Sequence, residues 1–445
     1  SEVLRGQIGS LEQAVENSTN ASNMISTTEA SLAEINDLLV GIRESLIFAL
    51  NTGGTSTEQI AAEQNSVDFA IQAIKRIADV TRFGSLQMLN GASSFEITSY
   101  TTSGLLEVRP LSVQFNPTTT STSYSVVVYG VASQARGLLA SVVAPGTIAA
   151  SGGPITLRLR GPQGTEEINL ASGATNTDLA GAINLLRGNL GIYASGGYMY
   201  SETFGSDVSI SVQKLGGTGT WSQPGFLGAG NVFYDSGIDA NATIAGNSAS
   251  ARGNRLQVVS TFFTGTVFLN PATNQDTTNP SGGTGTYQFT IANGSGLLFQ
   301  FGPNANANEQ RVIGFPNSVP SNLGEKRMRI GGVWYGGGLP SLQSGGDNDL
   351  FTNPGNALRV TDAAINNISE SRAYLGAFVS QTVEPNIRSL NVAVENLSAS
   401  ESSIRDLDFA EAVAEMTRNQ VIFQSGVSVL AQANLIPQAV LRLLQ

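Results

Sequence analysis

The chain has 445 residues, enough for several domains, and its net charge of −11 argues against DNA, RNA or an anionic membrane surface as a partner. It contains no cysteine and no histidine, which excludes disulfides, cysteine- or histidine-ligated zinc sites, and Ser-His-Asp or Cys-His nucleophiles. Only 13% of residues are charged and 41% are hydrophobic, so we expect a real core beneath a weakly charged surface. No apolar run reaches the length of a membrane span, so no membrane insertion is expected.

Residues 1–92 predict two helices. Apolar residues recur at spacings of three and four, or their sum, which is typical of a long helix packed against other long helices. The positions expected to pack are Leu4, Ile8, Leu11, Val15, Leu39, Ile42 and Leu46. The stretch from Asn51 to Gly54 should end this helix. A second helix is expected to follow, with Val67, Ile71, Ile74 and Ala78 turned inward.

Residues 93–353 change to the period-two alternation of β-strands, for example at residues 124–129, 155–159 and 208–212, with Gly- and Pro-rich breaks between the runs. One helix interrupts them, with Asn176 or Thr177 as its N-cap and Leu179, Ile183 and Leu186 on one face. Residues 154–214 therefore predict a ββαββ module inside a mostly β region.

Residues 354–445 return to helical spacing. The first stripe includes Leu375 and Val379, and it continues after Pro385 through Leu390, Val394 and Leu397. Because proline cannot donate a backbone hydrogen bond, we expect a kink or a break just before Pro385. After residue 400 a new seam runs at strict 4-3 spacing through Phe409, Val413, Met416, Gln420, Phe423, Val427, Leu430 and Asn434. Polar residues in such a seam cost stability but fix its register.

The predicted fold class is α+β. Helices from both chain ends (residues 1–92 and 354–400) are expected to form a long antiparallel rod. The β-rich residues 93–353 are then an insertion into the rod, and residues 401–445 form a further C-terminal helix.

Several stretches resemble the bacterial flagellin family. At the C-terminal end they are residues 396–410 (NLSASESSIRDLDFA), residues 430–434 (LAQAN) with Pro437 and Gln438, and residues 372–377 (RAYLGA). At the other end they are residues 1–11 (SEVLRGQIGSL), parts of residues 27–44, and Leu89-Asn90-Gly91. Residues 154–214 look like the insertion module of flagellins and filament-cap proteins. Residues 299–306 (FQFGPNAN) are similar to a short β motif beside the rod, which we expect over residues 297–324.

The resemblance implies a structural subunit of the flagellar filament, exported by the flagellar type III apparatus to the extracellular flagellum and active in motility. It implies contacts with other copies, with filament-cap and hook-junction proteins, and with an export chaperone that covers the C-terminal core helix. No catalytic, cofactor or metal residues are expected. Flagellins carry several dozen residues before the position that matches Ser1, so we expect this chain to lack the N-terminal part of the innermost core. Pro385 also departs from the usually unbroken rod helix.

The family's innate-immune recognition surface lies on this rod, and Arg43, Glu44 and Glu63 match it. Gly41 and Ser45 stand where recognised members carry a large basic and a large aliphatic side chain. Since loss of two large side chains removes an anchor, we expect weak recognition by that receptor.

Other interpretations remain open. The glycine-rich residues 331–338 lack a following Gly-Lys-Ser/Thr, so turns are favoured over a phosphate cradle. The acidic pairs Glu166-Glu167 and Asp347 with Asp349 favour solvated surface over a sugar-cleaving or calcium site. Aromatic residues of the β region could instead bind polysaccharide or host glycan: Tyr198, Tyr200, Trp221, Phe233, Tyr234, Trp334 and Tyr335. A hook–filament junction protein shares the rod plan, although the LAQAN ending favours flagellin.

Overall fold

The computed structural model describes residues 2–51, 53–115, 119–139, 153–218, 232–270, 285–304, 306, 309–330, 333–405 and 409–443. Some residues named in the predictions lie outside these ranges: Thr52, Trp221, residues 331–332 and residues 406–408. The chain forms two compact units: Ser1–Glu16 with Asn386–Gln445, and Asn17–Pro385. Each unit is described by itself below.

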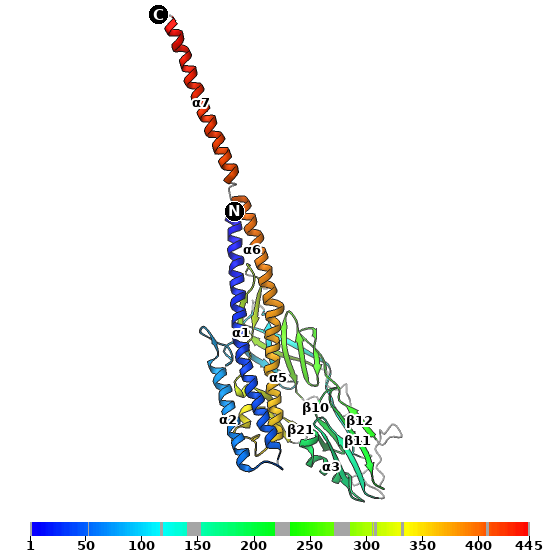
Figure 1. Ribbon diagram of the computed structural model, residues 1–445. Helices are drawn as coiled ribbons and strands as arrows, with labels where there is room; N and C mark the ends of the chain where they lie inside the picture. The colour runs from blue at the N-terminus through cyan, green and yellow to red at the C-terminus, as the bar shows by residue number, and fades with distance from the viewer. Residues whose placement is uncertain are drawn as a thin grey trace. The chain divides into compact units, whose positions relative to one another are not determined.

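The helices and strands together confirm the predicted α+β class (Figure 1). The α-helices are α1 (Glu2–Leu50), α2 (Thr57–Val80), α3 (Asn176–Leu185), α4 (Arg187–Leu190), α5 (Pro354–Phe378), α6 (Glu384–Arg405) and α7 (Phe409–Leu443). Two 3-10 helices, η1 (Pro320–Asn322) and η2 (Leu339–Leu342), and a π-helical turn, η3 (Val379–Val383), complete the helical elements of the described residues.

The strands of the first half are β1 (Arg82–Phe83), β2 (Leu86–Gln87), β3 (Ile97–Tyr100), β4 (Leu105–Val113), β5 (Ser121–Gly130), β6 (Gln134–Leu138), β7 (Ile155–Arg160), β8 (Thr165–Leu170), β9 (Ile192–Ser195), β10 (Tyr198–Phe204) and β11 (Ser209–Gly216). Those that follow are β12 (Val232–Ser236), β13 (Asn241–Ile244), β14 (Asn247–Ser248), β15 (Ser250–Arg252), β16 (Arg255–Val259), β17 (Phe263–Leu269), β18 (Gly285–Ala292), β19 (Leu297–Gln300), β20 (Gln310–Ile313), β21 (Gly324–Ile330) and β22 (Val333–Gly338). Within the glycine-rich stretch 331–338, the described residues 333–338 form β22, which pairs antiparallel with β21.

Helix α1 follows a heptad pattern over most of its length. Apart from Met24 and Ser45, its buried positions repeat at intervals of three and four: Leu11, Ala14, Ser18, Ala21, Ile25, Thr28, Leu32, Ile35, Leu39, Ile42, Leu46 and Ala49. In the first half of this stripe Ala14, Ser18 and Ala21 are small, so neighbouring backbones can approach closely there. The helix ends at Leu50, before the glycines, and Ser56 starts α2 with a capping box to Gln59.

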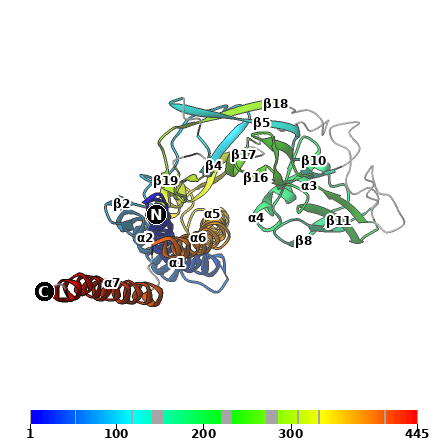
Figure 2. The same ribbon diagram turned by 90° about the horizontal axis from the view of Figure 1, so that it is seen from above.

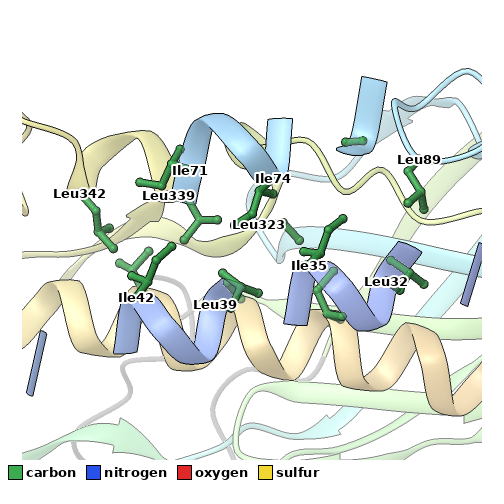
Figure 3. Packing of buried hydrophobic residues seen from close by; sticks show 14 of the residues in the cluster. Leu32, Ile35, Leu39, Ile42, Ile71, Ile74, Leu89, Leu323, Leu339 and Leu342 are labelled. Atoms are coloured by element: carbon green, nitrogen blue, oxygen red, sulfur yellow. The ribbon is translucent and has the colours of Figure 1, made fainter. Parts of the chain in front are cut away.

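The helices α1, α2 and α5 of the larger unit share one hydrophobic core (Figure 3). Leu32, Ile35, Leu39 and Ile42 of α1 face Ile71 and Ile74 of α2, together with leucines from residues 323–342. The same core contains Phe315, Leu323, Leu339, Leu342 and Leu350. Phe315 and Leu323 fall in the motif that was expected beside the rod. Leu339, Leu342 and Leu350 were predicted to belong to the outward-facing insertion, so the boundary at 353/354 cuts through the helical core. The reason is that three helices with thin apolar stripes leave a side open, and this later segment covers it.

A buried amide fixes that covering segment to α2. The Gln64 side chain donates to the Leu342 carbonyl over 2.9 Å and accepts from the Leu350 backbone N–H over 2.8 Å. Both backbone groups would otherwise be buried without partners, which costs free energy.

Two antiparallel sheets enclose the second core. One has the strand order β14-β13-β5-β18-β3 and the other β15-β16-β17-β4-β20-β19, and β5 and β18 run side by side in Figure 2. Side chains from both sheets meet in this core, where the Tyr124, Phe263 and Phe289 rings lie 5.1–5.5 Å apart between centroids.

The third core contains the module predicted over residues 154–214. Its elements from β7 to β10 follow the predicted ββαββ order, with α4 and β11 in addition, but its strands divide between two sheets. The hairpin of β9 and β10 pairs with β6, whereas β11 returns to pair with β7 in the sheet β12-β11-β7-β8. The two sheets and α3 share the core, so β6 and β12 belong to it and the predicted boundaries are too narrow. The N-cap of α3 is Thr175, not Asn176 or Thr177, because Thr175 has extended backbone and forms a capping box with Asp178.

The interruption expected before Pro385 is the π-helical turn η3 rather than a break. A proline removes the hydrogen bond to the carbonyl four residues earlier and its ring crowds that carbonyl. A π turn widens the helix where that crowding occurs, so the chain stays helical from α5 into α6.

Candidate assembly interface

The apolar side chains of α7 lie exposed along the helix. The exposed fraction in the predicted seam runs from 43% at Val413 to 79% at Phe409. Met416, Phe423, Val427 and Leu430 fall between these values, and Asn434 is exposed as well. The seam residues share a helix face, and within the described chain that face is open to solvent.

The predicted seam is not the whole apolar surface of α7. Val421, Ile422 and Val429 are also 58–64% exposed. At about 100° per residue, Ile422 and Val429 lie roughly opposite the seam. A helix that is apolar on opposite sides is suited to burial on more than one side. The strict 4-3 template missed these residues, although adjacent apolar residues such as Val421 and Ile422 were a visible signal.

In the smaller unit, the N-terminal part of α1 packs against α6. Leu11, Ala14 and Leu390 are buried together, and four further residues pack against them: Val15, Ala393, Val394 and Leu397. Leu4 and Ile8 are half-buried. The predicted rod residues from the two chain ends are therefore in contact in this unit.

In the larger unit, the remaining rod residues lie in or against the helical core. Leu39, Ile42, Leu46 and Leu375 are at most 1% exposed, and Val379 packs against the same core. Two buried hydroxyl groups on the helix seams form hydrogen bonds within their own helices. Thr28 donates to the Met24 carbonyl and Thr361 donates to the Ala357 carbonyl, both over 2.9 Å. These two hydroxyl groups can therefore be buried in the seam without losing a hydrogen bond.

Aromatic rings join β19 to α5. Phe299 stacks on Phe301, whose ring lies 6.0 Å from the Phe378 ring, and Phe378 stacks on Tyr374. Burial raises the pKa of the Tyr374 hydroxyl to about 12, so it is uncharged at neutral pH. These contacts hold Phe299 and Phe301 of the predicted motif against the helix.

The residues matched to the receptor surface are engaged within the chain. Arg43 pairs with Asp362 of α5 over 2.7 Å, and the Ser45 hydroxyl donates to the Glu63 carboxylate of α2 over 2.5 Å. Ser45 is buried, whereas Glu44 is exposed. Beside them, a groove of about 510 Å³ between α1 and α2 includes Gly41 in its lining.

The acidic pair Glu166-Glu167 is explained by local contacts. Glu167 pairs with Arg158 over 2.8 Å, and Glu166 accepts from the Asn189 amide over 3.0 Å. Across the described ranges, no three acidic side chains gather closely enough to hold a metal ion. No helix in those ranges is both long and apolar enough to cross a membrane.

Comparison with known proteins gives a consistent result at both chain ends. Residues 1–94 match the bacterial flagellin N-terminal helical region, and residues 358–444 match the bacterial flagellin C-terminal helical region. A flagellin of Bacillus subtilis is 38% identical over 175 residues, which are 36% of this chain and 54% of that protein. The B-type flagellin of Pseudomonas aeruginosa is 27% identical over an alignment that covers 99% of this chain and 89% of that protein.

The chain spans about half of that Bacillus flagellin, and 31% of a Treponema pallidum flagellin. Among solved structures, cap-protein domains from Serratia marcescens cover 40% of this chain and 92% of that one at 20% identity, with a TM-score of 0.27. That score is too low to indicate a shared arrangement. A putative flagellin of Bacillus subtilis is 36% identical over 151 residues, which are 34% of this chain and 82% of that relative. The chain therefore belongs to the bacterial flagellin family.

Proposed function

We propose that this chain is a structural subunit that polymerises into the bacterial flagellar filament for motility, and that it acts by assembly rather than catalysis. The observation that carries this proposal is the pair of exposed apolar faces on α7. Burying one such side chain contributes about 1.5–3 kcal/mol, so the helix gains most when other copies surround it. Contacts that repeat head to tail without closing produce an open helical polymer.

The rod helices support the same function. Their seams combine aliphatic residues with small and hydroxyl side chains such as Ala14, Ser18 and Thr28. Seams of this kind permit small shifts between nearly equivalent packings, and such shifts are a physical route to filament supercoiling.

The decisive experiment is polymerisation of the subunit carrying Val427→Asp and Leu430→Asp. Two charges in the seam should abolish filament formation, measured by sedimentation and electron microscopy. Val259→Asp is the matched control, because Val259 is 78% exposed on β16, outside the proposed seam. Normal filaments from the double variant would refute the proposed seam.

Before assembly, α7 needs a temporary cover. An exposed apolar helix suits a helix-in-groove partner, and we assign this role to a cytosolic export chaperone. Export through the flagellar type III apparatus then leads to the extracellular flagellum, where filament-cap and hook-junction proteins are the further partners. The same Val427 and Leu430 substitutions should abolish co-purification of the chaperone with the subunit. If the chaperone still co-purifies at the normal level, it does not bind at this helix face.

Recognition by the innate-immune receptor should be weak. Gly41 offers no side chain, and Ser45 is buried in its hydrogen bond to Glu63, so neither position presents an anchor. A receptor-reporter assay should give a low response, and Gly41→Arg should raise it. A full-strength response from the unaltered chain would overturn this expectation.

A further inference from the structure

One face of the sheet formed by β6, β10 and β9 carries a cluster of tyrosines and arginines. Strand alternation places Tyr198, Tyr200 and Glu202 on the face opposite Met199, which lies in the hydrophobic core. The register sets Tyr200 beside Tyr193 on β9 and beside Arg136 on β6. These side chains therefore share the face that points away from the core.

The rings and guanidinium groups contact one another in sequence. The Tyr193 and Tyr200 centroids are 5.4 Å apart with an interplanar angle of 24°, and Tyr198 lies 5.9 Å from Tyr200. The Arg187 guanidinium lies 4.7 Å from the Tyr193 ring, and that of Arg136 lies 5.6 Å from the Tyr198 ring. We call this set of five residues the tyrosine face.

The tyrosine face has a fixed base and an accessible rim. Tyr193 is buried, and its hydroxyl donates to the Gln134 side chain over 3.3 Å. Tyr198 and Tyr200 are partly exposed and Arg136 is exposed. Cross-strand aromatic pairs alone contribute roughly 0.2–1 kcal/mol to a sheet, so stability gives one reason for these rings. It does not explain why tyrosines with arginines stand on the solvent side, away from the core.

The charges on this face and at its β6 edge balance. Arg187 pairs with Glu202 over 2.6 Å, and the Asp235 carboxylate accepts from the Arg136 backbone N–H over 2.7 Å. Burial raises the pKa values of the Tyr193 and Tyr200 hydroxyls, which therefore remain uncharged donors at neutral pH. A polyanion or a polycation gains no net attraction from two positive and two negative groups.

We propose that the tyrosine face binds a neutral saccharide. The aromatic rim offers apolar surface for the C–H faces of a sugar ring, while the tyrosine hydroxyls and the Arg136 guanidinium supply hydrogen bonds to its hydroxyls. A nucleic acid would stack on the same rings, but its phosphates need an excess of positive charge that the face lacks. A proline-rich peptide also docks on aromatic residues, but it offers one carbonyl acceptor per residue, whereas each sugar ring offers several hydroxyls.

The test uses the complete chain on surfaces that carry one probe each: cellohexaose, mannohexaose, heparin hexasaccharide or decaproline. The variants are Tyr198→Ala with Tyr200→Ala, and Tyr200→Phe, which keeps the ring and removes its hydroxyl. Tyr129→Ala is the control, because Tyr129 is 56% exposed on β5 in another sheet. Thermal melts followed by circular dichroism confirm that each variant is folded.

We expect at least one neutral probe to bind, the double variant to bind it about tenfold more weakly, and Tyr129→Ala to leave it unchanged. Tyr200→Phe should weaken it about threefold through the lost hydrogen bond, and this variant tests the site even if the double variant unfolds. Three results would overturn the proposal. The first is that neither neutral saccharide binds at about 10 mM. The second is that a neutral saccharide binds but none of the tyrosine-face variants weakens its binding, and the third is that only heparin hexasaccharide or decaproline binds.

Discussion

The helical core of the larger unit and the terminal helix α7 carry similar sequence patterns and have opposite environments. Leu32, Ile35 and Leu39 recur at helical spacing and are fully buried, whereas Phe423 and Leu430 recur at the same spacing and are more than 60% exposed. The spacing of apolar residues therefore identifies a helix face that is stabilised by burial. Whether the cover comes from the same chain depends on what packs against that face.

The cover in the larger unit comes from an unexpected part of the chain. Leu323, Leu339 and Leu342 close the side of the core left open by the helices. The described part of the chain gives α7 no such closing segment, since its apolar side chains are exposed. The proposed filament supplies that cover by other copies.

The largest effect that separates the two regions should come from Leu39→Ala. Removal of a fully buried leucine side chain should lower the free energy of unfolding by about 2–5 kcal/mol, measured by urea unfolding of the monomer. Leu430→Ala is the counterpart, and it should change the same quantity by less than about 0.5 kcal/mol. Equal losses in the two variants would show that α7 is packed within the monomer.

The cover over the core can be tested separately at Gln64. Gln64→Met keeps the side-chain length but leaves the Leu342 carbonyl and the Leu350 N–H without their partner, at a cost of about 1–3 kcal/mol. Gln72→Met, on the exposed face of α2, should be nearly neutral. If both glutamine variants melt at the same temperature, the amide does not hold the segment.

A smaller, pH-dependent effect is expected at Asp349 in the covering segment. Burial opposes the charged form, but hydrogen bonds from Thr352, Gly345 and Phe351 lower the pKa of this carboxylate below its ordinary value. Its stabilising contribution is therefore present above about pH 4 and is lost as the pH falls through the lower folded-state pKa. Asp349→Asn should flatten the loss of stability in acid, measured as urea midpoints across pH. A variant whose midpoints fall in acid as steeply as those of the unaltered chain would contradict this role.

The smallest effect should come from the ion pair between α1 and α5. Arg43 and Asp362 are each more than 40% exposed, so their coupling in a double-mutant cycle should be below about 1 kcal/mol and should fall further at high salt. A coupling of several kcal/mol would mean that this pair, rather than the apolar core, joins the two helices.

The helices were predictable because each buried stripe repeats over many turns, as in α1 from Leu11 to Ala49. The membership of the cores was not predictable in the same way. Leu339 and Leu342 lie in a short 3-10 helix with no repeat to identify their partners, and the pairing of β10 with β6 depends on contacts distant in sequence. The second apolar side of α7 was missed because one heptad template was fitted to a helix that is apolar on two sides.

The π-helical turn η3 also keeps the helical stripe in phase. The buried positions Ile368 and Leu375 are seven residues apart, and Val383 follows after eight. Without the added residue, every later side chain would be rotated by about 100° around the helix axis. A single-residue deletion between Val379 and Val383 would therefore act like a frameshift on the packing stripe, although every amino acid after it would be unchanged.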